Sequence, residues 1–170
     1  MAERKKDTEK LIASNPIAHA NYFIDEVMEA GIALTGTEVK SLRLQTPNLR
    51  DSYVDVKNVR GVTEAWLTNL HIGPYVHGNI WNHEPMRRRK LLLHRHQIQK
   101  LYGGVIQGGL QIIAIRMYFK MGRAKIEIGM GRGKKKYDKR QTLKGKTAER
   151  EMDQAMKQGA RRASHRREED

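Results

Sequence analysis

The 170-residue chain carries 33 Lys and Arg against 19 Asp and Glu, for a net charge of +14, and its length favours one domain with extensions. A surface this basic attracts polyanions, so nucleic acid is the expected partner class. The absence of cysteine excludes disulfides and thiolate metal sites, and no apolar run reaches the roughly 20 residues of a membrane span or forms a signal core, so we expect a cytoplasmic protein.

The N-terminal segment is polar and basic, which predicts a mobile arm over residues 1–20. Residues 21–34 are ambiguous. Ile24 and Met28 share a helical face, while the apolar residues on either side of them fit a long strand bent at Gly31. Periodicity alone leaves both interpretations open.

A short helix and a β-hairpin are predicted next. Thr35 and Glu38 have the spacing of a capping box, at the start of a helix that ends before Pro47. Residues 52–57 then alternate, a turn ends in glycine, and residues 62–72 resume an extended pattern. These features predict two antiparallel strands.

The stretch "GPYVHGNIWNHEPMRRR", residues 73–89, has no clean period and predicts a long surface loop. It runs into the basic segment 87–90. Trp81 and His83 lie beside that segment and offer stacking planes for unpaired bases, so we expect RNA contact here. Trp66 lies in an alternating strand instead, where an aromatic residue is usually buried, so it is assigned to the core.

The rest of the body gives a helix and the clearest hairpin. Apolar residues recur at helical spacing over 98–106, and a pair of glycines ends the helix. Residues 110–120 and 123–130 alternate around the turn "MG", with one apolar and one charged face. The pattern predicts a mainly β fold over residues 21–131: a small closed antiparallel barrel of the oligonucleotide-binding (OB) type with two or three helices.

Residues 132–170 are predicted to be a basic C-terminal tail. The last 40 residues hold 14 Lys and Arg against 7 Asp and Glu, which is half of the net charge. They offer too few large apolar groups to fold alone, so we expect disorder in the free protein. A weak apolar stripe that includes Met152 predicts a helix that orders only against a partner.

Enzymatic interpretations are disfavoured. Glu38 and Lys40, with Asp25 upstream, resemble the acid-x-Lys motif of metal-dependent nucleases, but that motif needs a strand and the capping box predicts a helix. The three evenly spaced histidines between positions 71 and 83 lack zinc-ligand spacing. We therefore expect no catalytic residue, metal or cofactor. A metal-dependent nuclease and a structural ribosomal protein remain the alternatives to an RNA-binding adaptor.

Several motifs follow one another in register: "YFIDEVMEAGIALTGTEVKSLR", "NLRDSY", "RRRKLLLH", "MYFKMGRAKIEIG" and "GRGKKKYDKR". In order and spacing they resemble the SsrA-binding protein family (small protein B, SmpB) from about Asn15 to Arg140. The resemblance implies an OB barrel in which residues 21–34 form a strand. It also implies an adaptor of trans-translation, which rescues stalled ribosomes.

Members of that family bind the tRNA-like domain of transfer-messenger RNA (tmRNA, SsrA). The resemblance implies that binding favours charging by alanyl-tRNA synthetase and delivery with elongation factor Tu. It further implies that the tail, helical on the ribosome, enters the vacant mRNA channel near the small-subunit decoding site.

These considerations give two sets of expected site residues. Glu29 has two interpretations, since an acid in a basic body either simply stays solvated or accepts hydrogen bonds from the Watson–Crick edge of guanine. The RNA-binding set is Asn15, Tyr22, Glu29, Lys40, Arg43, Trp81, His83, Arg87, Arg88, Arg89, Lys90, Leu92, His94 and Lys125. The ribosome-engaging set in the tail is Gly133, Lys134, Lys135, Lys136, Tyr137, Asp138, Lys139, Arg140 and Met152.

Overall fold

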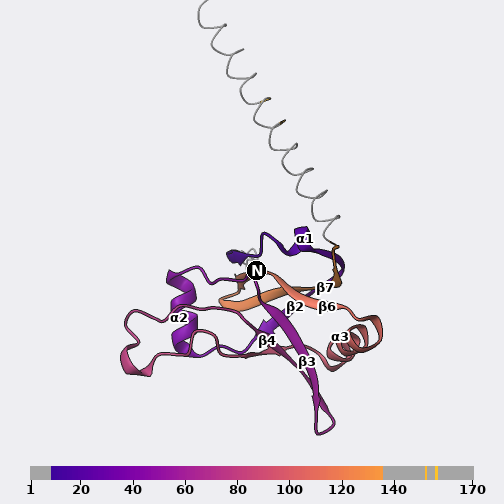
Figure 1. Ribbon diagram of the computed structural model, residues 1–170. Coiled ribbons are helices and arrows are strands. Elements are labelled where there is room, and N and C mark those ends of the chain that lie inside the picture. Colours follow the sequence, from indigo (N-terminus) through magenta and orange to yellow (C-terminus); the bar gives the residue numbers. More distant parts are fainter. Residues whose placement is uncertain (1–8, 136–151, 153–155, 157–170) are drawn as a thin grey trace, which may run out of the picture. The chain divides into compact units, whose positions relative to one another are not determined.

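The computed structural model describes residues 9–135, 152 and 156 (Figure 1). The elements in chain order are β1 (Lys10–Ser14), α1 (Ala18–Asn21), β2 (Tyr22–Ile32), α2 (Gly36–Leu44), β3 (Tyr53–Val59), β4 (Val62–Thr68), the 3₁₀ turn η1 (Asn79–Trp81), β5 (Arg89–Leu92), α3 (Arg95–Gly108), β6 (Gln111–Lys120) and β7 (Arg123–Gly133). None of the helices in the described part is long and apolar enough to span a bilayer.

The strands form one antiparallel sheet that closes on itself. Its order is β1-β6-β3-β4-β5-β2-β7, and β7 pairs with β6 again. Strands β3 and β1 share one edge of β6: β3 pairs at Ile113, and β1 pairs further along, from Arg116 to Phe119. Closure through the β6–β7 and β3–β6 pairings confirms the predicted mainly β closed barrel with two or three helices, of which the structure has three, α1 to α3.

The barrel interior is filled by alternating residues of every strand. Ala65 and Leu67 of β4 and Ile126 and Ile128 of β7 are almost completely buried. Helix α3 contributes Leu101 to the same core, and Figure 1 shows α2 and α3 on opposite sides of the barrel. The two-residue period of the last hairpin therefore predicted its core face correctly.

Both predicted hairpins have two-residue turns. Arg60 and Gly61 have φ of 52° and 80°, and Met121 and Gly122 have φ of 50° and 75°. Two successive positive φ angles match the right-handed twist of the strands, and glycine at the second position removes the steric cost there. The β3–β4 hairpin extends beyond the barrel in Figure 1.

The ambiguous segment is strand β2, which pairs with β7 along most of its length, from Tyr22 opposite Gly133 to Gly31 opposite Lys125. The two backbones come very close: a Cβ at Gly131 would collide with the carbonyl oxygen of Phe23. Strand β7 therefore continues to Gly133, two residues past the predicted end of the barrel. This places Gly133 in a strand, whereas we expected it in the tail.

The N-terminal segment also differs from its prediction. Instead of a mobile arm over residues 1–20, residues 10–14 form β1 and residues 18–21 form α1. This segment is structured because β1 pairs with β6, about 100 residues later in the chain, and no local pattern reveals that pairing. Residues 1–8 lie outside the described part of the chain.

Most of the tail, with Lys136, Tyr137, Asp138, Lys139 and Arg140, also lies outside the described residues. Of positions 136–170 only Met152 and Met156 are described, and both are helical and exposed. The tail and the barrel belong to separate units that divide after Gly133.

Candidate nucleic-acid interface

A charged cluster lies on the outer face of the barrel, around Glu29 of β2. The Tyr118 hydroxyl of β6 donates a 2.5 Å hydrogen bond to Glu29 Oε2. The ammonium groups of Lys120 and Lys125 lie 3.5 Å from Oε2 and 3.2 Å from Oε1. The Glu29 and lysine side chains remain about one third exposed, so this cluster of four residues, the Glu29 cluster, is open to a ligand.

Strand register explains why these distant residues meet. Leu92 of β5 lies opposite Gly31 of β2, Gly31 lies opposite Lys125 of β7, and Lys125 lies opposite Tyr118 of β6. One row therefore crosses four strands. Gly31 has no side chain, and a Cβ there would lie 3.1 Å from the Leu92 Cβ. Leu92, which is 58% exposed, thus occupies the place next to the Glu29 cluster.

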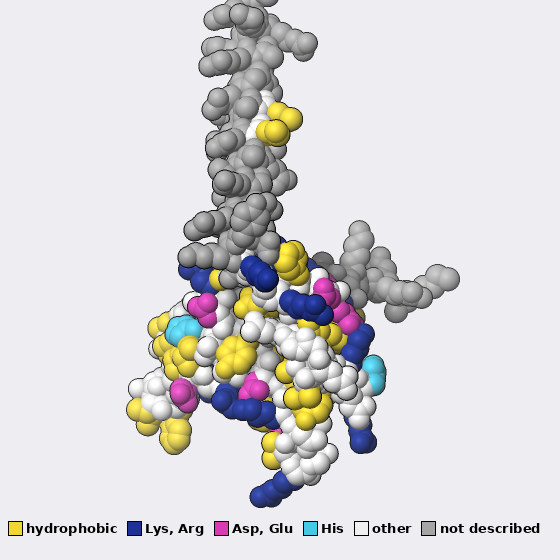
Figure 2. All heavy atoms as spheres, turned by 45° about the vertical axis from the view of Figure 1, so that its right-hand side comes forward, with side chains coloured by type: hydrophobic (Ala, Val, Ile, Leu, Met, Phe, Trp, Pro, Cys, Tyr) yellow, Lys and Arg dark blue, Asp and Glu magenta, His cyan; other side chains and the backbone are white. Residues whose placement is uncertain are grey.

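A second row reinforces the first. Glu29 lies opposite Glu127 of β7, which lies opposite Arg116 of β6. Arg116 Nε donates a 2.7 Å hydrogen bond to Glu127, and its guanidinium lies 5.2 Å from the Tyr118 ring centroid. We call the outward side chains of β5, β2, β7 and β6 the outer wall. It carries both acidic and basic side chains, Glu29 and Glu127 with Arg116 and Lys125, and Figure 2 shows basic, acidic and hydrophobic groups interspersed on one face of the molecule.

The Glu29 cluster holds a carboxylate, not a carboxylic acid. The hydrogen bond from Tyr118 lowers the pKa of Glu29, its burial opposes this shift, and Lys125 and Lys120 lower the pKa further. Burial and the bond to Glu29 raise the pKa of Tyr118, so the phenol stays protonated. A carboxylate has about four acceptor positions and Glu29 receives three donors, so it can still accept from a base amino group.

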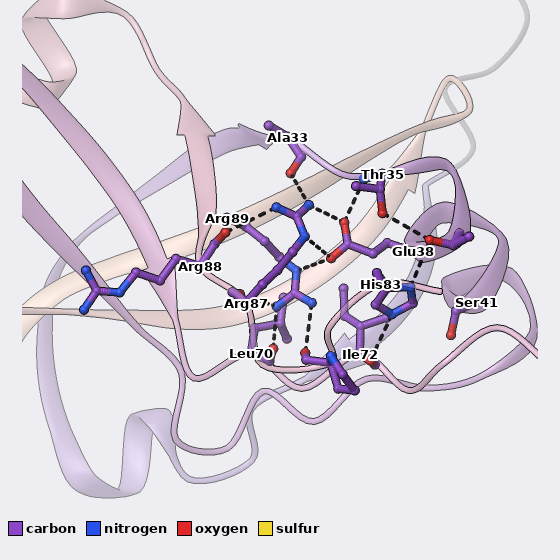
Figure 3. A network of polar contacts seen from close by, with 12 residues as sticks. Ala33, Thr35, Glu38, Ser41, Leu70, Ile72, His83, Arg87, Arg88 and Arg89 are labelled. Carbon is purple, nitrogen blue, oxygen red and sulfur yellow. Dashed lines mark hydrogen bonds and ion pairs between the residues drawn. The ribbon is translucent and has the colours of Figure 1, made fainter. Parts of the chain in front are cut away.

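A second carboxylate, Glu38 of α2, is fully buried (Figure 3). Its oxygens accept hydrogen bonds from Arg87 Nε and Nη2 and from Arg89 Nε, at 2.8, 2.5 and 2.8 Å. The amide of Thr35 adds a 2.7 Å bond, so the predicted capping box is present. Arg89 also donates to the carbonyls of Leu70, Pro85 and Arg87, which fixes both ends of the long loop.

The buried network sets the ionisation of its members. Burial by itself raises the pKa of Glu38, but the bonds from Arg87 and the Thr35 amide and the charge of Arg89 outweigh it, so the pKa lies below its ordinary value. Burial lowers the pKa of Arg89, which Glu38 opposes. Because guanidinium titrates so far above neutral pH, the pair remains ionic.

The basic run 87–90 is therefore divided between two roles. Arg89 is completely buried, which is at odds with its expected RNA contact, and Arg87 is half-buried in the same network. Arg88 extends away from the network in Figure 3 and is exposed. Lys90 is exposed and pairs with Glu64. Successive side chains of a strand point to opposite faces. Because Arg89 points inward, its neighbours Arg88 and Lys90 point outward.

Asn15 is also structural in this fold. Its side-chain amide donates to the backbone carbonyls of Leu49, Arg50 and Ala114, at 3.2, 3.2 and 3.0 Å. Only 6% of the residue is exposed. All the donor capacity of this side chain is used inside the protein, where it attaches β1 to the barrel, so the expected RNA contact of Asn15 stays a prediction that this geometry does not favour.

The long loop is held in one conformation by its own polar groups. The Asn82 side chain accepts from the Tyr75 amide and donates to the Tyr75 carbonyl. Half-buried His83 contacts the Thr37 hydroxyl and the Ile72 carbonyl. The Lys40 ammonium lies 5.6 Å from the Tyr75 ring centroid. These contacts leave Trp81 83% exposed, as its predicted role requires.

The remaining expected residues are accessible to different degrees. Arg43 is exposed on α2, and His94, exposed at the start of α3, stacks on His96 at 5.7 Å between centroids. Tyr22 is half-buried at the start of β2. Lys134 is half-buried and Lys135 exposed, directly after β7.

Sequence reasoning missed Tyr118 and Lys120, the partners of Glu29 on β6. Both lie in the strand 110–120 that was predicted, and their alternation with Met117 and Phe119 already placed them on the outer face. What was missing was the strand order. Trp66 was also misassigned: it is half-buried and lies outside the core cluster, since Ala65 and Leu67 take the inward positions of β4.

The nuclease arrangement is absent from this geometry. Glu38 is fully occupied by two arginines, and Lys40 lies over an aromatic ring. Within residues 9–135, 152 and 156, no three His, Cys, Asp or Glu side chains are grouped to hold a metal ion.

Comparison with known proteins gives consistent results. The model of the family described as SmpB protein matches residues 12–158. The SsrA-binding protein of Pelobacter propionicus is 54% identical over 149 residues, which cover 88% of this chain and 95% of that protein. The SsrA-binding protein of Clostridium perfringens is 50% identical over 158 residues, which cover 93% and 97%. A chain of the solved structure reported as "tmRNA-SmpB: a journey to the center of the bacterial ribosome" is 40% identical, with a TM-score of 0.60, and the match covers 77% of this chain and 93% of that one.

Proposed function

Because the chain belongs to the SmpB protein family, we propose that it is an RNA-binding adaptor of trans-translation that binds the tRNA-like domain of tmRNA and takes it to stalled ribosomes. The two relatives compared above are named SsrA-binding proteins, and the report of the matching solved structure names tmRNA, SmpB and the bacterial ribosome. The proposal assigns tmRNA binding to the barrel.

The observation that carries the assignment is the outer wall. Glu29, Leu92 and Lys125 are more than 30 residues apart in sequence, yet strand register brings them to one exposed surface. A rigid sheet holds them at fixed spacing, which suits recognition of a folded RNA by shape. Lys125 provides charge for a phosphate, Glu29 an acceptor for a base edge, and Leu92 an apolar contact.

The tail supplies the ribosome contact in this proposal. Lys134 and Lys135 begin it, and the basic residues that follow enter the vacant mRNA channel near the decoding site, where the tail becomes helical. Competition between tail and mRNA for one channel then confines rescue to ribosomes with an empty channel. Alanyl-tRNA synthetase and elongation factor Tu act on the same tmRNA, and we propose that the adaptor reaches them through that RNA.

A binding titration with the isolated tRNA-like domain of tmRNA tests the role of the outer wall. We expect Lys125→Ala and Glu29→Gln each to weaken binding by about 10- to 150-fold, because a charged hydrogen bond lost at an interface is worth about 1.5 to 3 kcal/mol. Lys57→Ala on the β3–β4 hairpin removes the same charge from a side chain whose ion pair among the described residues is with Asp55, and is the matched control.

The comparison separates local contact from general attraction. If the protein attracts RNA only through its net charge, Lys57→Ala and Lys125→Ala will weaken binding equally, and Glu29→Gln will strengthen it. That result would remove the outer wall from the proposal. Failure of the unmodified protein to bind the domain would contradict the proposed function itself.

A further inference from the structure

Trp66 lies on the outside of the barrel, although an aromatic residue in such a strand is usually buried. Its neighbours Ala65 and Leu67 are fully buried, so the alternation of β4 turns Trp66 outward. The residue is half-buried, so it is not enclosed by the core as its neighbours are. No packing requirement of the core explains an indole at this position.

A single carboxylate orients both Trp66 and the lysine opposite it. Trp66 Nε1 donates a 3.2 Å hydrogen bond to Glu64 Oε2, and Lys90 Nζ donates a 2.5 Å bond to Glu64 Oε1. Trp66 and Lys90 are direct partners between β4 and β5. The indole N–H is therefore satisfied within the protein, and a ligand is left with the ring itself and the ammonium beside it.

This group is continuous with the outer wall. Lys90 and Leu92 are two residues apart on β5 and share its outward face. Leu92 is the member of the first row that lies opposite Gly31. Trp66 thus lies two strands from β2, which corresponds to about 10 Å at the ordinary strand spacing. An RNA seated on the outer wall would need only to continue across β5 to reach it.

We propose that Trp66 is a stacking platform for an unpaired nucleotide of the tmRNA that binds the outer wall, and that Lys90 meets a phosphate beside that nucleotide. The inference rests on the proposed function and deepens it. An aromatic ring next to a cation is the arrangement by which proteins hold unpaired bases, since the base stacks and the backbone is neutralised. Glu64 is a positioning residue that fixes both groups and touches no RNA.

Tryptophan fluorescence tests the contact directly, because the chain has only Trp66 and Trp81. In the full-length Trp81→Phe protein, Trp66 is the sole tryptophan, so emission excited selectively through the indole reports on Trp66 alone. We expect the tRNA-like domain of tmRNA to quench this emission, with a midpoint equal to the Kd measured by gel shift in the same protein. Binding without any change in emission would overturn the proposal. So would quenching by small ribosomal subunits alone, which would assign the nucleotide to another RNA.

Substitutions separate stacking from packing. We expect Trp66→Leu to weaken binding of the domain about tenfold, and Trp66→Phe to restore most of it, because stacking needs a ring and Leu offers only apolar bulk. Thermal melts of both variants show whether the barrel is intact. Equal affinity of the Leu and Phe variants, with both folded, would refute stacking. If the unmodified protein binds no tmRNA, the proposed function fails first, whatever Trp66 does.

Discussion

Replacement of Glu38 by glutamine tests how the long loop is attached to the barrel. Gln has the same shape but no charge, so the two guanidinium groups that converge on Glu38 lose their counter-ion. The carboxylate accepts four hydrogen bonds, three of them from arginines. An amide can accept at one oxygen only, and its NH₂ group would face donors.

The expected loss is large. Removing one partner of a buried ion pair costs about 3 to 5 kcal/mol, because the other charge remains buried without compensation. For a domain of this size that loss lowers Tm by about 12 to 20 °C. Glu26→Gln is the control, since Glu26 pairs with Lys100 at the surface, where a pair is worth about 1 kcal/mol or less.

The assay is urea unfolding of both variants, repeated across pH. The pKa of Glu38 is lower in the folded protein than in the unfolded chain. Its stabilisation is therefore complete above the unfolded pKa of about 4.3 and is lost as pH falls through the folded value. The advantage of the unmodified protein over Glu38→Gln should be constant near neutrality and shrink in acid. A Glu38→Gln protein within 1 kcal/mol of the unmodified one at pH 7 would refute the reasoning.

Two further predictions concern the end of the barrel. Gly131→Ala should destabilise the protein by about 2 kcal/mol or more, because the new Cβ collides with the Phe23 carbonyl. In Gly36→Ala the new Cβ meets no atom within 4 Å, so this control should keep its stability. Equal melting temperatures of the two variants would contradict the close approach of β2 and β7. Truncation after Lys135 keeps β7 whole and should leave binding to the tRNA-like domain within about twofold, a difference of about 0.4 kcal/mol, while abolishing tagging of stalled chains; parallel loss of both activities in a folded protein would contradict the division of roles.

Most of the fold was predictable from local sequence patterns. The capping box at Thr35, the turns before Gly61 and Gly122 and the alternation of the last hairpin each depend on a few adjacent residues, and all are present. Pairing of β1 with β6 depends on residues about 100 positions apart, so the sequence analysis predicted a mobile arm where the structure has a strand. Long-range pairing of this kind has no signature in sequence spacing.

Several residues of the candidate site were predictable from the sequence, but their grouping on one surface was not, because it depends on long-range strand pairing. The motif resemblance named Glu29, Leu92 and Lys125 separately, and register then brings them to one wall. Composition could not show that Arg88 is exposed and Arg89 buried. Which side chains of a basic run point outward depends on how the strand is placed in the sheet. The assignment of Trp66 to the core was wrong because it relied on a general tendency. Most tryptophans in strands are buried, but here the neighbours of Trp66 take the inward positions.

The central claim is that this barrel selects tmRNA among the RNAs of the cell. Purification of the full-length protein from cells, at a salt concentration that removes contacts made only through net charge, followed by sequencing of the bound RNA, tests it most directly. We predict strong enrichment of tmRNA over its cellular abundance, and loss of that enrichment with Lys125→Ala but not with Lys57→Ala. Enrichment of ribosomal RNA or another RNA in place of tmRNA would contradict the claim.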